Sequence, residues 1–180
     1  MNDDAKKKIL TYLLLAFALS AVFYYLILGP GHGKLGNLTV LGLMWSPGVA
    51  GLATRLIYQR NLRGIGWGWG RTRYQLASYL LPLVGGLLVY GIAWSTGLGG
   101  FKGATSHRPL LVSLLLLATV GFLNGAVFAL GEELGWRGLL VPELAKVTGF
   151  GGTAAVSAAV WALYHYPLIL FGDYHSAAPR

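Results

Sequence analysis

The sequence contains no cysteine, and acidic residues are nearly absent from most of it. The missing cysteines exclude disulfide bonds and a thiol nucleophile. Between Ala5 and Gly131 there is not one Asp or Glu, and only 11% of all residues are charged. Because a soluble domain usually carries about 25% charged residues, this scarcity of charge argues against a water-soluble protein.

Long apolar runs take the place of charged residues. Hydrophobic residues make up 55% of the chain, and its mean hydropathy is +0.59. A helix needs roughly 20 apolar residues to cross a bilayer. Five runs are long enough: 9–28, 38–58, 74–95, 109–131 and 153–171. We therefore expect an all-α fold, a polytopic membrane helix bundle that forms one integral membrane domain over residues 1–180.

The first run has some features of a cleaved signal peptide. A basic start precedes it, and "ALSA" resembles a cleavage site. Its apolar stretch continues through "VFYYLIL", however, which is too long for a signal-peptide core. We expect an uncleaved anchor helix.

The net charge of +8 comes from basic residues near the ends of the apolar runs. We interpret it as a topology signal and not as a nucleic-acid interface. Ten basic residues fall on one side: Lys6, Lys7, Lys8, Arg55, Arg60, Arg63, Arg71, Arg73, Arg137 and Lys146. Four fall on the other: Lys34, Lys102, Arg108 and Arg180. The positive-inside rule places the N-terminus in the cytoplasm, and the short chain favours a bacterial plasma membrane.

Two prolines bear on the helices. Pro47 lies inside the second run, where we expect it to serve helix packing. The helical pattern of the fourth run continues past its apolar part to Val141, and Pro142 predicts a break there.

Two adjacent carboxylates, Glu132 and Glu133, end the acid-free stretch. An ionisable residue inside a membrane helix costs about 2.5–3.5 kcal/mol on insertion scales, and so faces the bundle interior or a water-filled cavity. Arg137 follows Glu133 at i+4, so the two can pair on one helix face. Glu132 points about 100° away. Without a partner on its own helix, its carboxylate could act as an acid or a base.

His165 is the expected partner of Glu132, because it is the only histidine inside an apolar run. At 1.5 Å per residue, Glu132 lies about 13 Å and His165 about 18 Å from the cytoplasmic ends of two antiparallel helices. Their side chains therefore reach comparable depth. His32 and His107 fall in predicted loops and are not site candidates.

A structural interpretation of the same residues stays open. Glu133 and Arg137 could be a packing pair, Glu132 could extend toward the cytoplasm, and His165 could be a satisfied core residue. A proton or ion carrier is a further alternative. It would require polar residues along one pathway through the membrane, and the first and third runs offer no ionisable groups except tyrosines.

The two motifs resemble those of a known family. "EELGWRG" contains EExxxR, formed by Glu132, Glu133 and Arg137, and "WALYH" resembles FxxxH with Trp161 in place of Phe. His165 follows Arg137 by 28 positions. This combination resembles the CPBP family of CAAX-processing and bacteriocin-processing intramembrane proteases, also called the Abi family. The likeness covers residues 120–168, within a predicted motif-bearing helix pair over 109–171.

The resemblance implies an intramembrane endopeptidase. Glu132 and His165 would activate a water molecule, Glu133 and Arg137 would orient the site, and Trp161 would be a supporting aromatic. The family's third motif, HxxxN, is not found in these 180 residues; His175 has Pro179 at the fourth following position. We therefore expect a truncated family member, with a catalytically inactive immunity or assembly factor as the alternative function.

The resemblance also bears on cofactors and partners. Family members are often described as metalloproteases, but catalytic zinc usually has three protein ligands. Since Glu132 and His165 supply two, we favour a site without a metal over one with zinc. The expected partners are the lipid bilayer and a membrane-associated peptide or protein. A prenylated CAAX tail, a bacteriocin leader and a membrane anchor all remain open as substrates.

Overall fold

The computed structural model describes residues 3–29, 36–65, 68–99 and 109–172, and this part of the chain consists of helices and the turns and loops that join them. The first three helices are α1 (Asp3–Leu28), α2 (Asn37–Gln59) and α3 (Thr72–Ser95). An uninterrupted helical run follows: α4 (Leu110–Leu116), η1 (Leu117–Gly121), α5 (Phe122–Gly135), η2 (Trp136–Leu140) and α6 (Val141–Leu144). The last helix is α7 (Phe150–Phe171).

Five helices of the described part are long and apolar enough to cross a membrane. They are α1, α2, α3, the run Leu111–Leu144, and α7. The predicted fold class, an all-α polytopic bundle, is therefore confirmed. His32, His107 and His175 lie outside the described residues, as do the four basic residues assigned to the outer side.

The predicted break at Pro142 is wrong. The helical run continues through Pro142 and ends at Leu144. Pro142 lies in the first turn of α6, directly after the π-helical turn η2. Proline lacks the N–H that would bond to the carbonyl of Gly138 four residues earlier, and the Arg55 side chain donates to that carbonyl instead.

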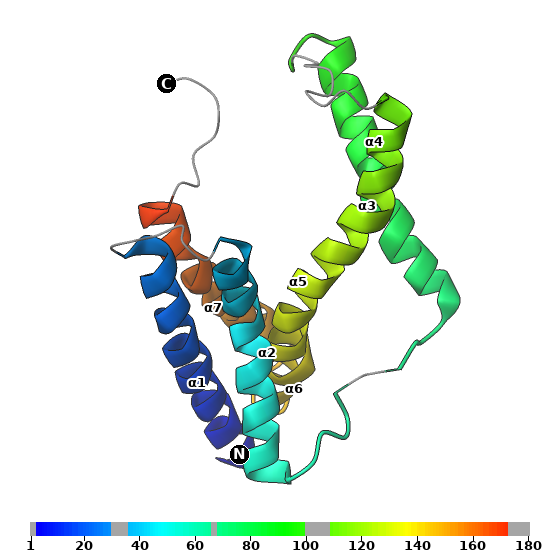
Figure 1. Ribbon diagram of the computed structural model, residues 1–180. Coiled ribbons are helices and arrows are strands. Elements are labelled where there is room, and N and C mark those ends of the chain that lie inside the picture. Colours follow the sequence, from blue (N-terminus) through cyan, green and yellow to red (C-terminus); the bar gives the residue numbers. More distant parts are fainter. Residues whose placement is uncertain (1–2, 30–35, 66–67, 100–108, 173–180) are drawn as a thin grey trace. The chain divides into compact units, whose positions relative to one another are not determined.

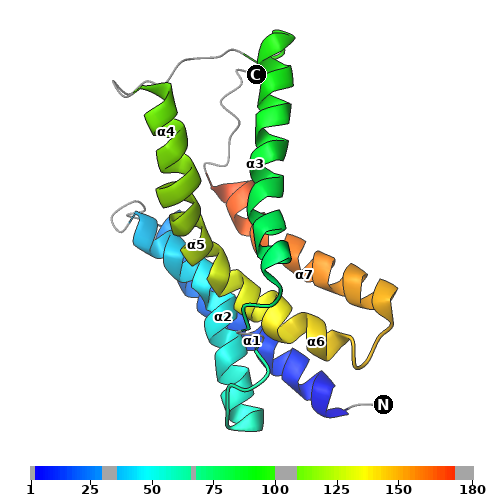
Figure 2. The same cartoon turned by 90° about the vertical axis from the view of Figure 1, so that its right-hand side faces the viewer.

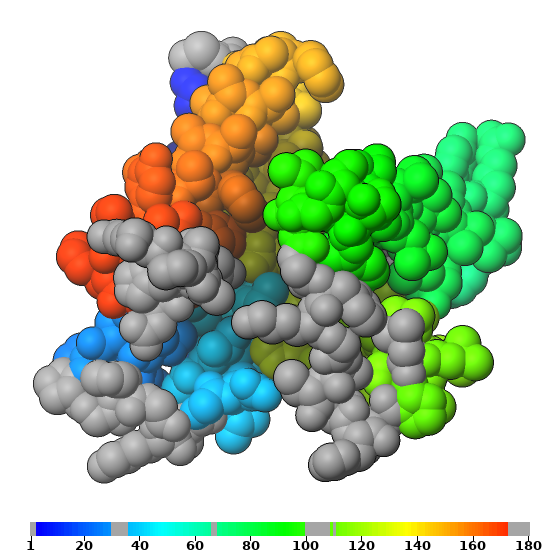
Figure 3. Space-filling view, turned by 90° about the horizontal axis from the view of Figure 1, so that it is seen from above, coloured from blue at the N-terminus to red at the C-terminus, as the bar shows by residue number. Residues whose placement is uncertain are grey.

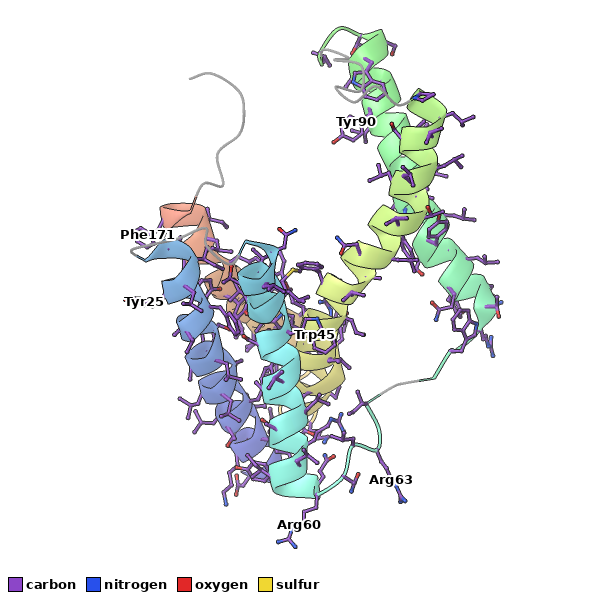
Figure 4. The ribbon with its side chains drawn as sticks, viewed as in Figure 1. Tyr25, Trp45, Arg60, Arg63, Tyr90 and Phe171 are labelled. Carbon is purple, nitrogen blue, oxygen red and sulfur yellow. The ribbon has the colours of Figure 1, made fainter. Side chains whose placement is uncertain are left out.

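Arg55 and Arg73, two of the ten basic residues counted on the cytoplasmic side, lie inside helices. Arg55 belongs to the end of α2 and is buried, and Arg73 belongs to the first turn of α3. Arg60 and Arg63 do lie in the loop after α2, as Figure 4 shows. The buried position of Arg55 implies a structural role, which its place in the sequence did not predict.

The chain divides into two compact units. Unit 1 consists of residues 1–66 and 126–180, and unit 2 consists of residues 67–125. The expectation of one membrane domain over residues 1–180 stays a prediction.

Unit 1 contains α1, α2, α7 and most of the run from α5 to α6 (Figures 1 and 2). Its buried core joins side chains from all of these elements: Tyr12, Ala16, Leu43, Ala50, Trp136, Leu139, Leu140, Leu144 and Tyr164. α7 (orange to red) runs along one face of the unit in the space-filling view of Figure 3. Because lipid tails are as apolar as leucine, close packing and hydrogen bonds must hold such a bundle together.

Unit 2 contains α3, α4, η1 and the start of α5. Within it, the Tyr79 hydroxyl donates a hydrogen bond of 2.6 Å to the carbonyl of Ala118. The Tyr79 ring also meets the Phe122 ring edge to face, with centroids 4.7 Å apart. α3 has no buried residue, so this unit is held by much less packing than unit 1.

Candidate active site

Glycine contacts set the position of α5 against α2. A Cβ on Gly131 would lie 2.6 Å from the carbonyl oxygen of Met44, and one on Gly135 would lie 2.5 Å from the carbonyl oxygen of Pro47. Gly48 of α2 meets Gly131 in the same way, at 2.6 Å. The Trp45 indole N–H donates to the carbonyl of Val127 at 2.9 Å, and Figure 4 shows Trp45 on the α5 side of α2. There is no room for a side chain at these glycine positions, so the backbones of α2 and α5 are in direct contact.

The two glycines flank the carboxylates in the order Gly131-Glu132-Glu133-Leu134-Gly135. This is a G-x-x-x-G pattern, the usual signal for close helix approach in membranes. The sequence interpretation did not use it. The glycine face lies on α2, which leaves Glu132 on a neighbouring face of α5.

Glu132 and His165 come together from α5 and α7. The distance from Glu132 Oε1 to His165 Nε2 is 4.0 Å. Their side chains are 12% and 28% exposed, respectively. The proximity predicted from their depths is therefore confirmed.

Trp161 contacts both members of this pair. Its indole N–H donates to Glu132 Oε2 at 3.3 Å. Its ring lies against the His165 ring, with centroids 4.2 Å apart. One oxygen of the carboxylate is thus held by Trp161, and the other faces His165. A phenylalanine in this place could not supply the N–H.

A backbone contact fixes the tautomer of His165. Its Nδ1 lies 2.8 Å from the carbonyl oxygen of Trp161. Because a carbonyl only accepts hydrogen bonds, Nδ1 carries the proton, and in the neutral imidazole the lone pair is on Nε2. That lone pair faces Glu132. The 4.0 Å separation is too long for a direct hydrogen bond, but it suits one water molecule that donates to both groups.

Glu133 pairs with Arg137, as their i,i+4 spacing predicted. Arg137 Nη1 donates to Glu133 Oε1 at 2.7 Å. The Glu133 side chain is 50% exposed and the Arg137 side chain 61% exposed. Glu132 is therefore free of Arg137 and available to α7.

A cavity of about 600 Å³ opens beside Glu132 and His165. Its remaining lining is mostly apolar: Tyr24, Ile27, Leu28, Val40, Leu43, Met44, Tyr164, Leu168, Phe171 and Gly172. A volume of this size can hold an extended ligand segment. A second cavity of about 320 Å³ is lined by Trp136, Arg137, Val141, Ser157, Ala158 and Trp161.

The described residues bring together fewer ligand-type side chains than a catalytic zinc ion usually has. Across the described residues, no three His, Asp, Glu or Cys side chains gather where they could hold a metal. Glu132 and His165 are two ligand-type side chains, and Glu133 is engaged with Arg137. Catalytic zinc usually has three protein ligands, one more than this pair supplies.

Arg55 supports the helical turn that follows the carboxylates. Its Nη2 donates to the carbonyl of Gly138 at 2.6 Å, and other bonds reach the carbonyls of Arg63 and Gly64. Pro142 has no N–H, so it cannot supply the usual i→i−4 bond to Gly138. Arg55 fills that position, which explains how a buried arginine and an internal proline occur together.

Comparison with known proteins identifies the region that carries these residues. Residues 106–178 match the model of the family described as Rce1-like, type II CAAX prenyl endopeptidase. A 75-residue stretch, 42% of this chain, is 33% identical to "CAAX prenyl protease 2" of Methanococcus maripaludis. That stretch covers 24% of the archaeal protein, so the chain spans about a quarter of the length of this curated relative. No solved structure matches the chain.

Proposed function

We propose that this chain is an intramembrane endopeptidase. The similarity of residues 106–178 to the Rce1-like family of type II CAAX prenyl endopeptidases supports this proposal. The observation that carries the proposal is the approach of Glu132 to His165 at 4.0 Å in a mostly apolar cavity. A carboxylate and a neutral imidazole that both face one point are suited to activating water.

The proposed reaction begins with a water molecule between Glu132 Oε1 and His165 Nε2. Glu132 takes one proton from the water while His165 accepts a hydrogen bond from the other. The water oxygen bonds to the carbonyl carbon of the substrate peptide and forms a tetrahedral intermediate. The C–N bond then breaks, and the proton on Glu132 passes to the leaving amine. The products are a carboxylic acid and an amine, so atoms and charge balance.

The remaining site residues have supporting roles in this proposal. The Trp161 N–H holds Glu132 Oε2, and the Glu133–Arg137 pair orients the adjacent face of the helix. The substrate is a membrane-associated peptide or protein, prenylated or not, that enters the apolar cavity. The basic residues Arg60 and Arg63 in the loop after α2 support a cytoplasmic N-terminus. The proposed location is a bacterial plasma membrane.

Purified protein in liposomes, assayed for cleavage of a prenylated CAAX peptide, tests this function. Glu132→Gln and His165→Gln should each lower the cleavage rate by about 10²–10⁴, the usual contribution of a general acid or base. Glu133→Gln is the matched control one position away, and it should retain measurable cleavage because Glu133 faces Arg137.

Full cleavage by Glu132→Gln would overturn the proposal. A folded wild-type protein that cleaves neither this peptide nor a bacteriocin leader peptide would favour the non-catalytic alternative, a membrane immunity or assembly factor. In that case the polar cluster of Glu132, Trp161 and His165 would serve fold specificity.

A further inference from the structure

Pro47 creates an unusual hydrogen-bond acceptor in the middle of α2. Proline has no backbone N–H, so Pro47 cannot donate to the carbonyl of Leu43 four residues earlier. α2 nevertheless continues from Asn37 to Gln59. Inside a bilayer, every backbone polar group needs a partner within the protein. The carbonyl of Leu43 must therefore be satisfied from elsewhere.

The Tyr164 hydroxyl of α7 satisfies it. Tyr164 Oη donates to the Leu43 carbonyl at 2.7 Å and accepts from the Ser20 hydroxyl of α1 at 2.8 Å. The Tyr24 hydroxyl, also on α1, donates to the backbone carbonyl of Tyr164. Tyr164 is 2% exposed. Its hydroxyl thus joins three helices at one buried point.

Packing fixes the ring of Tyr164 as well as its hydroxyl. The ring makes edge contacts with Trp136, Tyr24 and Phe17, at centroid distances of 5.2, 5.9 and 6.0 Å. Successive residues of a helix lie about 100° apart around its axis. When Tyr164 is fixed against α1 and α2, the direction of His165 is therefore set too.

Both members of the candidate catalytic pair take their positions from one short segment of α2. The helix that carries Glu132 touches this segment through Gly131 and Gly135, against Met44 and Pro47. The helix that carries His165 is bonded to it through Tyr164, at Leu43. Contacts with the α2 segment 43–48 therefore position both Glu132 and His165.

We propose that Tyr164 is a positioning residue, whose hydroxyl, bound to the Leu43 carbonyl that Pro47 leaves free, holds His165 in line with Glu132. The catalytic part of this inference depends on the proposed endopeptidase function. Tyr164 acts through the neighbouring His165, whose ring it meets edge to face with centroids 5.6 Å apart, and through the rotation of α7.

Tyr164→Phe tests the hydroxyl, because the ring and its edge contacts remain. We expect kcat to fall on the order of ten- to a hundredfold, as for a small misplacement of a catalytic group, with KM nearly unchanged. Tyr166→Phe is the matched control, since Tyr166 lies on the same helix and is half exposed. Unchanged kcat in Tyr164→Phe would overturn the proposal.

Pro47→Ala separates positioning from stability. The alanine in this variant has an N–H that can bond to the Leu43 carbonyl, so in the double variant Tyr164→Phe/Pro47→Ala this carbonyl regains a partner. We expect Tyr164→Phe alone to lower the midpoint of thermal unfolding. In the double variant the midpoint should rise again toward the wild-type value while kcat stays low. If kcat recovers together with the midpoint, Tyr164 has only a structural role and the inference fails.

A measurement without enzymatic activity distinguishes this inference from the proposed function. The chain has no native cysteine, so Glu132→Cys/His165→Cys introduces the only two thiols. A short bifunctional thiol reagent should cross-link them more slowly when Tyr164→Phe is added, and at an unchanged rate when Tyr166→Phe is added. Equal rates in all three backgrounds would overturn the inference. Slower cross-linking with Tyr164→Phe, in a protein that never cleaves peptides, would retain the positioning and reject the endopeptidase.

Discussion

Helices α2 and α3 are similar in sequence terms and different in structure. They have 23 and 24 residues, each is apolar enough to span a membrane, and each contains one internal proline. α2 buries polar residues such as Ser46, Thr54 and Arg55, whereas α3 has no buried residue. Apolar character therefore identifies a membrane helix without showing whether that helix organises a site.

The two prolines show the same difference. In unit 1, the carbonyl that Pro47 leaves free receives the Tyr164 hydroxyl. Pro82 similarly leaves the carbonyl of Ser78 without an i→i−4 donor. Within unit 2, no described side chain donates to that carbonyl, and Ser78 itself donates to Gln75. A proline thus contributes an interhelical bond only where a neighbouring helix places a donor in reach.

Among the variants that compare the two units, we expect substitution of a close-packed glycine to lower stability most. Gly135→Ala would place a Cβ 2.5 Å from the backbone of Pro47. Such overpacking typically costs about 1–3 kcal/mol, and the shift of α5 should also lower peptide cleavage. Gly91→Ala in α3 meets open space and should be neutral or stabilising, by up to about 1 kcal/mol from helix propensity.

Thermal denaturation in detergent, followed by circular dichroism, compares these two variants. Equal midpoints for Gly135→Ala and Gly91→Ala would show that the close approach of α5 to α2 is not needed. Gly151→Ala adds a control inside unit 1, because Gly151 lies in α7 with no atom near its missing Cβ.

Removal of Arg55 is expected to have the next largest effect. Arg55→Ala leaves the carbonyl of Gly138 without its donor, and an unsatisfied buried group costs about 1–3 kcal/mol. Arg73→Ala removes an exposed arginine from unit 2, where surface substitutions usually change stability by less than about 0.5 kcal/mol. Chemical denaturation of both variants measures the difference.

Arg55→Lys sharpens the result. It keeps the positive charge, but its single ammonium cannot reproduce the planar fork that reaches several carbonyls. We expect its stability to resemble that of Arg55→Ala. A wild-type stability for Arg55→Lys would mean that charge, and not hydrogen-bond geometry, is what the site needs.

The smallest predicted effect concerns unit 2. Tyr79→Phe removes the bond to the Ala118 carbonyl but keeps the ring contact with Phe122. Interhelical hydrogen bonds in membrane proteins average about 0.6 kcal/mol in double-mutant cycles. Hydrogen exchange should therefore become slightly faster in α3 and stay unchanged in α2. A destabilisation as large as that of Arg55→Ala would remove the contrast between the units.

The sequence predicted the number and type of the helices well, and their ends less well. Predicted spans 38–58 and 153–171 correspond to α2, at Asn37–Gln59, and α7, at Phe150–Phe171. The first helix begins earlier than the apolar run because charged residues extend it, with a Lys8–Asp4 pair at 2.6 Å. Hydropathy cannot detect such a turn, since polar residues outside the bilayer can be helical.

The sequence predicted which ionisable residues of the candidate site meet, but it did not predict the contacts that hold them in place. Helical spacing alone predicted the Glu133–Arg137 pair, and depth predicted that Glu132 meets His165. The sequence did not predict the hydrogen bond from the Trp161 indole N–H to Glu132, because this bond depends on how α7 is rotated against α5. The catalytic roles of these residues stay predictions until they are measured.

By itself, the sequence determined a helical membrane protein with a carboxylate on one helix and a histidine at matching depth on another. These properties follow from apolar length and from the fixed rise and turn of an α-helix, which depend on local chemistry. Only the tertiary structure decided which side chains satisfy the carbonyls left free by Pro47 and Pro142. The donors, Tyr164 and Arg55, lie far away in the sequence, and they reach those carbonyls only because the helices pack at particular rotations.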